Sequence, residues 1–227
     1  EEDRLGRTLS RTIEWIDKNT SNTEILVVND GSSDGTLAVA ESFTPRVQVI
    51  SYPRNRGKGY AIRAGVLAST GKTVLFSDAD LSTPIEEYFR LAKTLQYADI
   101  AIGSRALPDS VIVHNEPLHR RAMGKTFNKF VQMVALPGLS DTQCGFKLFR
   151  GDVARSLFND LTIMSFAFDV EILFMAGQRN YRIVEVPVQW NNDERTHVHV
   201  FKDSSRMLKD VIQIRIRHLW RTWRRNR

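Results

Sequence analysis

The sequence predicts an α/β fold in which a mostly parallel β-sheet is flanked by helices. Short, nearly continuous apolar runs, typical of strands buried on both faces of a sheet, alternate with segments in which apolar residues recur at helical spacing. This alternation indicates βαβ units on a parallel sheet. With 227 residues, 42% of them hydrophobic, the chain is long enough to bury a sizeable core.

The alternation is clearest in the first half of the chain. After an opening helix with apolar side chains at 9, 13 and 16, we expect strands at 24–29, 46–50, 74–76 and 99–104. Helices are expected between them at 36–43, 60–69 and 84–97, the last with Pro84 in its first turn.

The second half is less regular. Its patterns predict helices at 119–135, 151–158 and 168–177, then a strand at 181–190, a polar loop at 191–199 and a final helix. Neither an internal repeat nor a low-complexity linker is present. We therefore expect one domain over residues 1–200 and a basic, helical appendage over residues 201–227.

The appendage holds the positive charge of the chain. Residues 206–227 contain eight Lys and Arg against one acid, Asp210, so their net charge of +7 leaves about −1 of the total of +6 for residues 1–205. Apolar residues recur every three positions from Leu208 and two tryptophans follow, which favours an amphipathic helix at a membrane surface over nucleic-acid binding. A solvated helix end is the alternative.

The single cysteine excludes an internal disulfide framework.

Two carboxylates, Asp78 and Asp80, follow the apolar run at 74–76. Residues i and i+2 share one face of a strand, so both can point together if the extended conformation continues through them. Hard oxygen ligands suit Mg²⁺ or Mn²⁺ bound to phosphates, because Mg²⁺ usually takes one or two protein carboxylates and keeps several waters. The same pattern also fits an Asx turn that ends the strand.

Polar residues also follow two other predicted strands. Asp30 and Gly31 follow the strand at 24–29, and Arg105 follows the strand at 99–104. Ligands of parallel sheets bind outside the carboxyl ends of the strands. These residues and the carboxylate pair are therefore expected to meet in one crevice.

Six ordered motifs resemble those of family 2 glycosyltransferases of GT-A fold. They are Val28-Asn-Asp-Gly-Ser-Ser-Asp-Gly-Thr36, Asn55-x-Gly-Lys-Gly59, Asp78-Ala-Asp80, Gly103-Ser-Arg105, Asp141-x-x-Cys-Gly-Phe-Lys147 and Trp190. The set is most similar to the polyprenyl-phosphate sugar synthases, and among these to the dolichyl-phosphate β-glucosyltransferase branch. The resemblance covers essentially the whole chain. It implies that a first strand, and any amino-terminal membrane anchor, would precede Glu1.

On the donor side, the resemblance implies that Asp30 accepts a hydrogen bond from the nucleotide base, with Gly31 beside it. Lys58 would lie near the nucleoside diphosphate. Asp78 would contact the ribose or the metal, and Asp80 would ligate the metal.

On the acceptor side, the resemblance implies that Arg105 and Arg121, the latter preferred over its neighbour Arg120, bind a phosphate. Gln143 would line the sugar pocket, and Asp141 would orient the acceptor or take a residual proton. A phosphate monoester with a second pKa near 6 is largely a dianion at neutral pH, so a strong base is not obligatory.

Other polar residues have weaker parallels. Asp169 and Glu171 would bind sugar hydroxyls or support the site, or are simply acids at a helix start. Arg195 would close over the diphosphate, while His197 and His199 fit an exposed loop better than a metal site.

The implied reaction is inverting transfer of glucose from UDP-glucose to dolichyl or polyprenyl phosphate with Mg²⁺ or Mn²⁺. GDP-mannose as donor, or a polysaccharide as acceptor, keeps the fold, but the Ser82-Thr83-Pro84 sequence favours glucose. The non-enzymatic alternative is a membrane- or nucleic-acid-binding module driven by the basic tail. The enzyme is expected at the cytoplasmic face of a membrane, either the endoplasmic reticulum of a eukaryote or the plasma membrane of a prokaryote, without a nucleic-acid partner.

Overall fold

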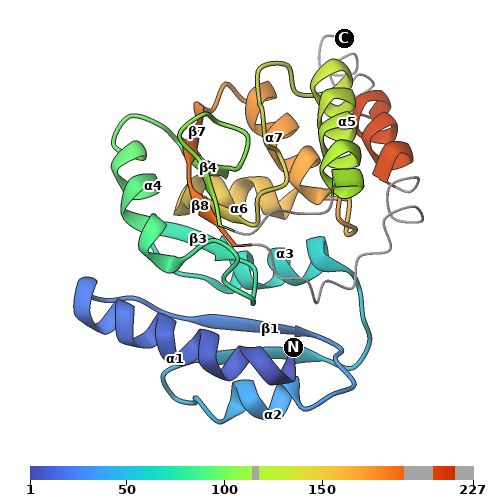
Figure 1. Cartoon of the computed structure of the whole chain (residues 1–227). Helices are drawn as coiled ribbons and strands as arrows, with labels where there is room; N and C mark the ends of the chain where they lie inside the picture. The colour runs from blue at the N-terminus through green and yellow to red at the C-terminus, as the bar shows by residue number, and fades with distance from the viewer. Residues whose placement is uncertain (114–117, 192–206, 218–227) are drawn as a thin grey trace.

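The computed structural model describes residues 1–113, 118–191 and 207–217, with the backbone alone at 118–123, 125 and 127 (Figure 1). The helices are α1 (Glu2–Asn19), α2 (Thr36–Glu41), α3 (Lys58–Ala68), the 3₁₀ turn η1 (Ile85–Glu87), α4 (Tyr88–Thr94), α5 (Leu118–Val134), α6 (Gly151–Asn159) and α7 (Phe168–Gln178). The strands are β1 (Leu26–Asp30), β2 (Gln48–Tyr52), β3 (Thr73–Ser77), β4 (Ile100–Ser104), β5 (Val111–Ile112), β6 (Phe146–Arg150), β7 (Ile183–Pro187) and β8 (Gln189–Trp190). A further helix covers 207–217.

The central sheet has the strand order β3-β6-β4-β7. Strands β4 and β7 are parallel, whereas β6 is antiparallel to both β3 and β4, so β3, β4 and β7 run in one direction. Strands β1 and β2 form a separate parallel pair, as do β5 and β8. The predicted α/β fold with a sheet flanked by helices is confirmed, and β6 makes the central sheet mixed.

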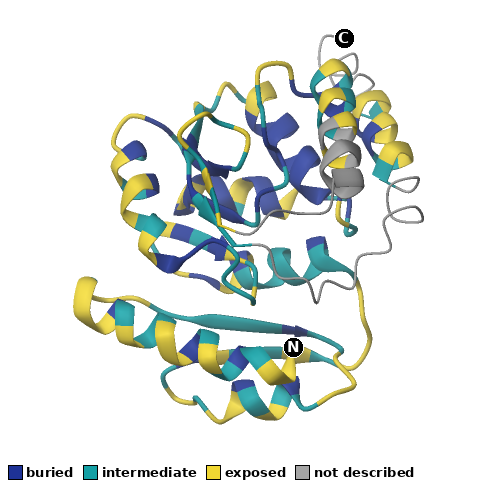
Figure 2. Ribbon diagram, viewed as in Figure 1, coloured by how far each residue is buried: buried dark blue, intermediate teal, exposed yellow. Residues whose placement is uncertain are grey.

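Both faces of the central sheet are buried (Figure 2). One face, with Phe76, Ile102 and Phe149, packs against α6 and α7. The opposite face, with Ala101 and Leu148, packs against η1 and α4. Burial on both sides explains why the strands read as continuous apolar runs in the sequence.

The β1–β2 pair is covered by α1 and α2, which contribute Leu5, Leu9 and Ala40 to a separate apolar cluster. Figure 1 shows this layer below the central sheet, and α3 contacts both β1 and β3. Because α3 contacts both sheets, its first residue, Lys58, lies where they meet.

Strand β6 was not predicted. Lys147 interrupts its apolar pattern, although the structure buries that lysine. The strand expected at 181–190 is divided into β7 and β8 after Pro187, and the helix expected at 84–97 ends at Thr94.

The helix at 207–217 packs on the domain, since Val211 and Ile214 are buried in the same cluster as the side chains of α7. The remaining parts of the predicted appendage, 201–206 and 218–227, lie outside the described residues, and the boundary at 200 stays a prediction. None of the helices in the described part of the chain has the length and apolar character needed to cross a bilayer.

Candidate active site

The turn that carries Asp78 and Asp80 follows β3, which ends at Ser77. The Leu81 amide donates to the Asp78 carbonyl oxygen at 3.2 Å, and the Ser82 amide donates to Asp80 Oδ1 at 2.9 Å. Leu81 has a φ of +49°, a left-handed conformation uncommon for leucine. Strand β3 therefore ends at Ser77, and a turn follows at residues 79 and 80. The turn, and not strand alternation, positions the two carboxylates.

Gly145 makes room for the Asp78 side chain. The Asp78 amide donates to the Gly145 carbonyl oxygen at 3.1 Å, just before β6 begins. A Cβ atom on Gly145 would overlap the Asp78 carboxylate. The absence of a side chain at 145 therefore determines where this carboxylate can lie.

Lys58 is the first residue of α3, and its Nζ lies 2.7 Å from Asp78 Oδ1. Burial acts to lower the pKa of Lys58. The carboxylates of Asp78, Asp169 and Asp80 together outweigh this effect and raise the pKa above its usual value. Lys58 is therefore charged at neutral pH and adjacent to both predicted metal ligands.

Two glycines let the Lys58 loop approach the segment 162–165. The Gly59 amide donates to the Met164 carbonyl oxygen at 2.9 Å. Gly57 has a φ of +99°, and a Cβ atom there would overlap the same carbonyl oxygen. The position of Lys58 thus depends on close backbone contact with this segment.

Asp30, the last residue of β1, binds the loop that precedes Lys58. Its Oδ1 accepts from the Arg56 amide at 2.7 Å and its Oδ2 from the Gly57 amide at 2.9 Å. Gly31 has a φ of +68°, and a Cβ atom there would lie 2.7 Å from the backbone of Arg54. Asp30 therefore holds this loop against the end of β1, and Gly31 leaves room for the loop backbone.

A hollow of about 320 Å³ lies at the carboxyl ends of β1 and β2. It is lined by Asn29, Gly31, Ser32, Leu37, Ser51, Tyr52 and Pro53. Of the predicted nucleotide-binding residues, Gly31 lines it directly, and Asp30 is its neighbour in the chain.

Asp141 and Arg105 form a bidentate ion pair. Asp141 Oδ2 accepts from the Arg105 amide at 2.9 Å and from Nε at 2.7 Å, and Oδ1 accepts from Nη2 at 3.0 Å. Burial acts to raise the pKa of Asp141, but attraction and hydrogen bonds from Arg105 lower it to about 2. Such a carboxylate is a poor base at neutral pH. The pair instead fixes the direction of the Arg105 guanidinium.

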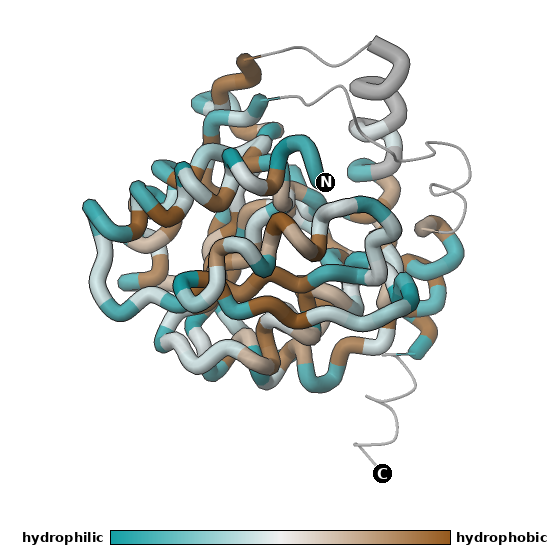
Figure 3. The backbone as a smooth tube through the Cα atoms, turned by 90° about the horizontal axis from the view of Figure 1, so that it is seen from below, coloured by the Kyte–Doolittle hydropathy of each residue, from teal (hydrophilic) through white to brown (hydrophobic). Residues whose placement is uncertain are grey.

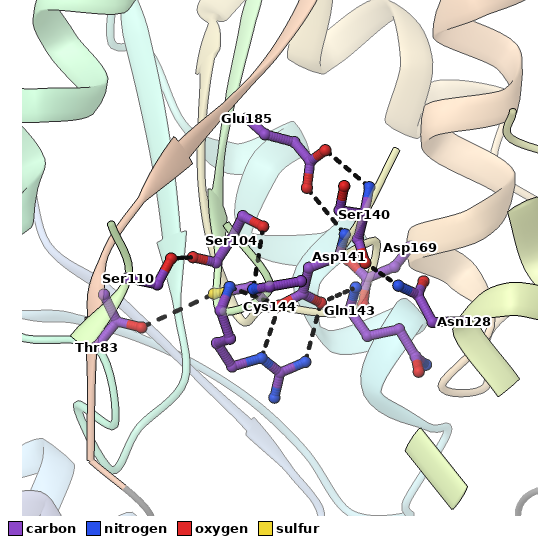
Figure 4. A network of polar contacts seen from close by, with 12 residues as sticks. Thr83, Ser104, Ser110, Asn128, Ser140, Asp141, Gln143, Cys144, Asp169 and Glu185 are labelled. Atoms are coloured by element: carbon purple, nitrogen blue, oxygen red, sulfur yellow. Dashed lines mark hydrogen bonds and ion pairs between the residues drawn. The ribbon is translucent and has the colours of Figure 1, made fainter. Parts of the chain in front are cut away.

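The loop of Asp141 is held by two neighbouring elements. Glu185 on β7 accepts from the Asp141 amide at 2.8 Å and from the Ser140 amide at 2.7 Å. Asn128 of α5 donates from its side chain to the Ser140 carbonyl oxygen. In Figure 4, Glu185 and Asn128 reach this loop from different sides.

Gln143 and Trp190 lie beside this ion pair. The Gln143 amide donates to Asp141 Oδ1 at 3.1 Å, and Figure 4 shows its half-buried side chain extending away from Glu185. The Arg105 guanidinium carbon is 5.4 Å from the centroid of the Trp190 ring, a cation–π distance.

Lys147 forms a buried ion pair beneath the site. Its Nζ donates to Asp169 Oδ1 and to the Cys144 carbonyl oxygen, both at 2.6 Å, and lies 5.2 Å from the centroid of the Phe76 ring. The Lys147 and Asp169 side chains are only 1% and 5% exposed. Burial raises the pKa of Asp169, and the ammonium groups of Lys147 and Lys58 oppose this. Lys147 thus joins β6, α7 and the loop of Asp141.

Glu171 is buried and supports the segment 162–165. Its carboxylate accepts from the Thr162 amide at 3.0 Å, from the Thr162 hydroxyl at 2.6 Å and from the Ile163 amide at 2.6 Å. These contacts favour the supporting role over sugar binding.

Several predicted residues lie outside the description. The side chains of Arg120 and Arg121 are not described, and Arg195, His197 and His199 lie in the range 192–206. Their predicted roles stay predictions.

The carboxylate oxygens of Asp78 and Asp80 suit a divalent cation. The side chains of Asp78 and Asp80 are 37% and 22% exposed and lie at one turn. In the described part of the chain, no group of three or more acidic, histidine or cysteine side chains is arranged around a metal site. Two protein oxygen ligands, completed by diphosphate and water, are the pattern expected for Mg²⁺ or Mn²⁺. Arg4 of α1 also approaches Asp80, with 3.9 Å between Nη1 and Oδ2.

Sequence reasoning missed the supporting residues Arg4 and Glu185, and it quoted Lys147 as the end of a motif without assigning it a role. A lysine between phenylalanine and leucine in a strand-like run is a usable signal for a buried ion pair. Arg4 and Glu185 carry no local signal, because the fold brings them in from distant elements.

The chain is similar in sequence to known proteins over most of its length. The family model described as "Glycosyl transferase family 2" matches residues 1–158. The dolichyl-phosphate beta-glucosyltransferase of Dictyostelium discoideum is 36% identical over 212 residues, which cover 88% of this chain and 65% of that protein. The protein of the same name from Drosophila melanogaster is 34% identical over 241 residues, covering 99% and 74%. The chain thus spans about two thirds to three quarters of their lengths.

Among solved structures, the glucosyl-3-phosphoglycerate synthase of Mycobacterium tuberculosis, in complex with Mn²⁺, UDP-glucose and phosphoglyceric acid, aligns with a TM-score of 0.70. The alignment covers 93% of this chain and 76% of that one at 16% identity, so the likeness concerns the fold, which is GT-A. With the family model matched over 1–158 and relatives above 30% identity, the chain belongs to glycosyl transferase family 2.

Proposed function

We propose that the chain catalyses inverting transfer of glucose from UDP-glucose to dolichyl or polyprenyl phosphate, giving a lipid-phosphate β-glucose. The observation that carries this proposal is the carboxylate turn of Asp78 and Asp80 beside Lys58, in a chain whose curated relatives are named dolichyl-phosphate beta-glucosyltransferases. The turn offers a divalent-metal site next to a lysine that suits a diphosphate.

On the donor side, Asp78 and Asp80 would hold Mg²⁺ or Mn²⁺, which when bound neutralises charge on the leaving UDP. Lys58 adds a positive charge beside them and binds the diphosphate. Asp30 binds two backbone amides through different oxygens, and each oxygen retains lone-pair capacity to accept from the nucleotide base. Gly31 lines the hollow beside Asp30, and its lack of a side chain lets the backbone of Arg54 approach closely.

On the acceptor side, Arg105 and Arg121 bind the phosphate of the lipid. Asp141 acts on Arg105, because it holds Nε and Nη2 and thereby aims the guanidinium. Gln143, in the same loop, lines the sugar pocket. Asp141 is assigned no proton transfer, since its lowered pKa makes it a weak base and the acceptor dianion needs none.

In the reaction, an oxygen of the lipid phosphate attacks the anomeric carbon from the face opposite UDP. The new bond joins that carbon to the phosphate oxygen. The bond from the carbon to the diphosphate oxygen breaks with its electron pair, which leaves with UDP. Attack from the opposite face inverts the configuration, so an α-linked donor gives a β-linked product. Because the acceptor is a lipid, the enzyme works at a membrane, and we assign it to the cytoplasmic face.

A donor panel with one short polyprenyl phosphate tests the proposal. UDP release should require UDP-glucose, the lipid phosphate and Mn²⁺ or Mg²⁺, and a chelator should abolish it. Asp80→Asn keeps an acceptor for the Ser82 amide but removes the charge, so turnover should fall by at least about a hundredfold. Asp109→Asn, at an exposed position, is the matched control. Release of GDP from GDP-mannose, or no turnover with any lipid phosphate, would contradict the proposal.

A further inference from the structure

The helix at 207–217 is fixed in rotation about its own axis. Val211 and Ile214, 0% and 1% exposed, lie in the main core. Asp210 Oδ2 accepts from the Ser165 hydroxyl at 2.5 Å, and Arg217 donates from Nη1 to the Thr162 hydroxyl. Apolar burial and two polar contacts therefore determine which face of this helix is turned outward.

The outward face carries an apolar row that the domain does not cover. Leu208, Ile212 and Ile216 are 36%, 47% and 52% exposed. Their spacing of four residues aligns them along one side of the helix. Figure 2 shows exposed positions along this helix, and Figure 3 shows apolar positions near its carboxyl end.

Basic side chains border this row on both sides. By helical geometry Lys209 follows the row on one side and Arg215 precedes it on the other, and both are exposed. The guanidinium carbon of Arg215 also lies 5.8 Å from the centroid of the Phe174 ring of α7. The acid of the helix, Asp210, is turned toward Ser165 and away from the row. The sequence that follows, 218–227, adds four arginines and two tryptophans.

We propose that the row of Leu208, Ile212 and Ile216, bordered by Lys209 and Arg215, docks on an anionic lipid bilayer. An apolar strip flanked by cations matches the acyl and headgroup layers of such a surface. This inference rests on the proposed function, in which the acceptor is a membrane lipid, and it identifies the protein face that meets that membrane.

Charge also argues against a second copy of the chain as the occupant. A twofold contact through the same row would bring the lysine and arginine borders of two copies together. Like charges placed together across an interface are unfavourable. Anionic headgroups instead neutralise both borders.

Co-sedimentation of the 227-residue chain with vesicles tests the proposal. It should bind vesicles of phosphatidylcholine mixed with phosphatidylserine, bind pure phosphatidylcholine vesicles less, and detach as salt rises. The triple variant Leu208→Ser, Ile212→Ser, Ile216→Ser should bind the mixed vesicles at least about tenfold more weakly. The control is Phe89→Ser on α4. Phe89 is 50% exposed, and Figure 1 shows α4 across the molecule from this helix. This variant should bind the vesicles as the parent chain does.

Two further measurements make the outcome decisive. Thermal unfolding checks the fold of the triple variant, and Lys209→Glu, Arg215→Glu gives a second variant that should lose the preference for phosphatidylserine. Turnover with a short polyprenyl phosphate in detergent should remain within about twofold in both, because none of these residues contacts the active site. If both variants fold and still bind the vesicles as the parent chain does, the docking surface is wrong. It is also wrong if the parent chain is a dimer in solution and the triple variant is a monomer, because the row would then be a contact between two copies. Loss of turnover in the parent chain would instead overturn the proposed function.

Discussion

Lys58 Nζ lies 2.7 Å from Asp78 Oδ1, so the predicted metal ligand already has a cationic partner supplied by the protein itself. Lys58 is also attracted by Asp80 and Asp169. A divalent ion bound at Asp78 would therefore compete with this lysine, and the diphosphate would offer the displaced ammonium a new partner.

Replacing Lys58 should weaken nucleotide binding and strengthen metal binding. We expect Lys58→Met to weaken UDP-glucose binding by about ten- to a hundredfold, as loss of a charge-assisted hydrogen bond predicts. Mn²⁺ should bind the nucleotide-free variant more tightly, because its competitor is gone, and Mn²⁺ electron paramagnetic resonance titration measures this. Lys93→Met, at an exposed position, is the control. Unchanged Mn²⁺ affinity in Lys58→Met would refute the competition.

Gly145→Ala should damage the metal site and spare most of the fold. The new methyl group would overlap the Asp78 carboxylate and displace it, so turnover should fall by at least about tenfold and require more Mn²⁺. Gly177→Ala is the control, since a Cβ atom there meets nothing within 4 Å. A Gly145→Ala enzyme with normal Mn²⁺ dependence would show that Asp78 is free to move.

Asp141→Asn should change the pH dependence of stability. The pKa of Asp141 is lowered from 3.8 to about 2, so the native state favours the charged form. Its stabilisation is fully present above about pH 4 and is lost as the pH falls through about 2. Removing the charge should cost roughly 2 kcal/mol at neutral pH. Urea unfolding between pH 2 and pH 7 should show a smaller acid-induced loss in the variant than in the parent.

Asp141→Asn also distinguishes two possible roles of Asp141, which are aiming the Arg105 guanidinium and acting as a base. If Asp141 acts by aiming Arg105, Asp141→Asn lowers turnover but keeps the parent's pH profile near neutrality, which the acceptor phosphate controls. Disappearance of an ionisation from that profile would assign Asp141 a proton-transfer role.

Lys147→Met should be strongly destabilising. It leaves Asp169 buried without its partner, which typically costs about 3–5 kcal/mol in the free energy of unfolding. The double variant Lys147→Met, Asp169→Leu should recover part of this loss, because neither member of the pair then carries a charge. Lys18→Met, which breaks the exposed pair with Glu14, should cost less than about 1 kcal/mol. Chemical denaturation of the four proteins measures the difference.

Local sequence predicted the parts of this site that depend on local structure. The carboxylates after β3, the glycine-flanked lysine and the strand–helix alternation are each visible within a few residues. Strand β6 was missed because its lysine looked like a solvent-facing residue, whereas Asp169, 22 positions further along, makes its burial possible. A lysine in a strand-like run can signal a buried ion pair, but hydropathy does not identify Asp169 as its partner.

The details of the site depend on contacts across the fold. The spacing of Asp78 and Asp80 fitted either a shared strand face or an Asx turn, and the hydrogen bonds of Leu81 and Ser82 show that the chain forms the turn. Similarly, Asp141 pairs with Arg105, 36 residues away, and its loop is supported by Glu185 of β7, 44 residues away. Sequence spacing does not determine such pairings.

The segment 162–165 has a consequence for how donor binding responds to the membrane. It contacts the Lys58 loop through Met164 and Gly59, and it contacts the helix at 207–217 through Ser165 and Asp210. A shift of that helix on a bilayer should therefore reach the donor site through a single short peptide, so the KM for UDP-glucose should differ between vesicles and detergent. Ser165→Ala removes one of the two polar contacts between the helix and this peptide, while the contact of Arg217 with Thr162 stays, and it should make the two values more alike.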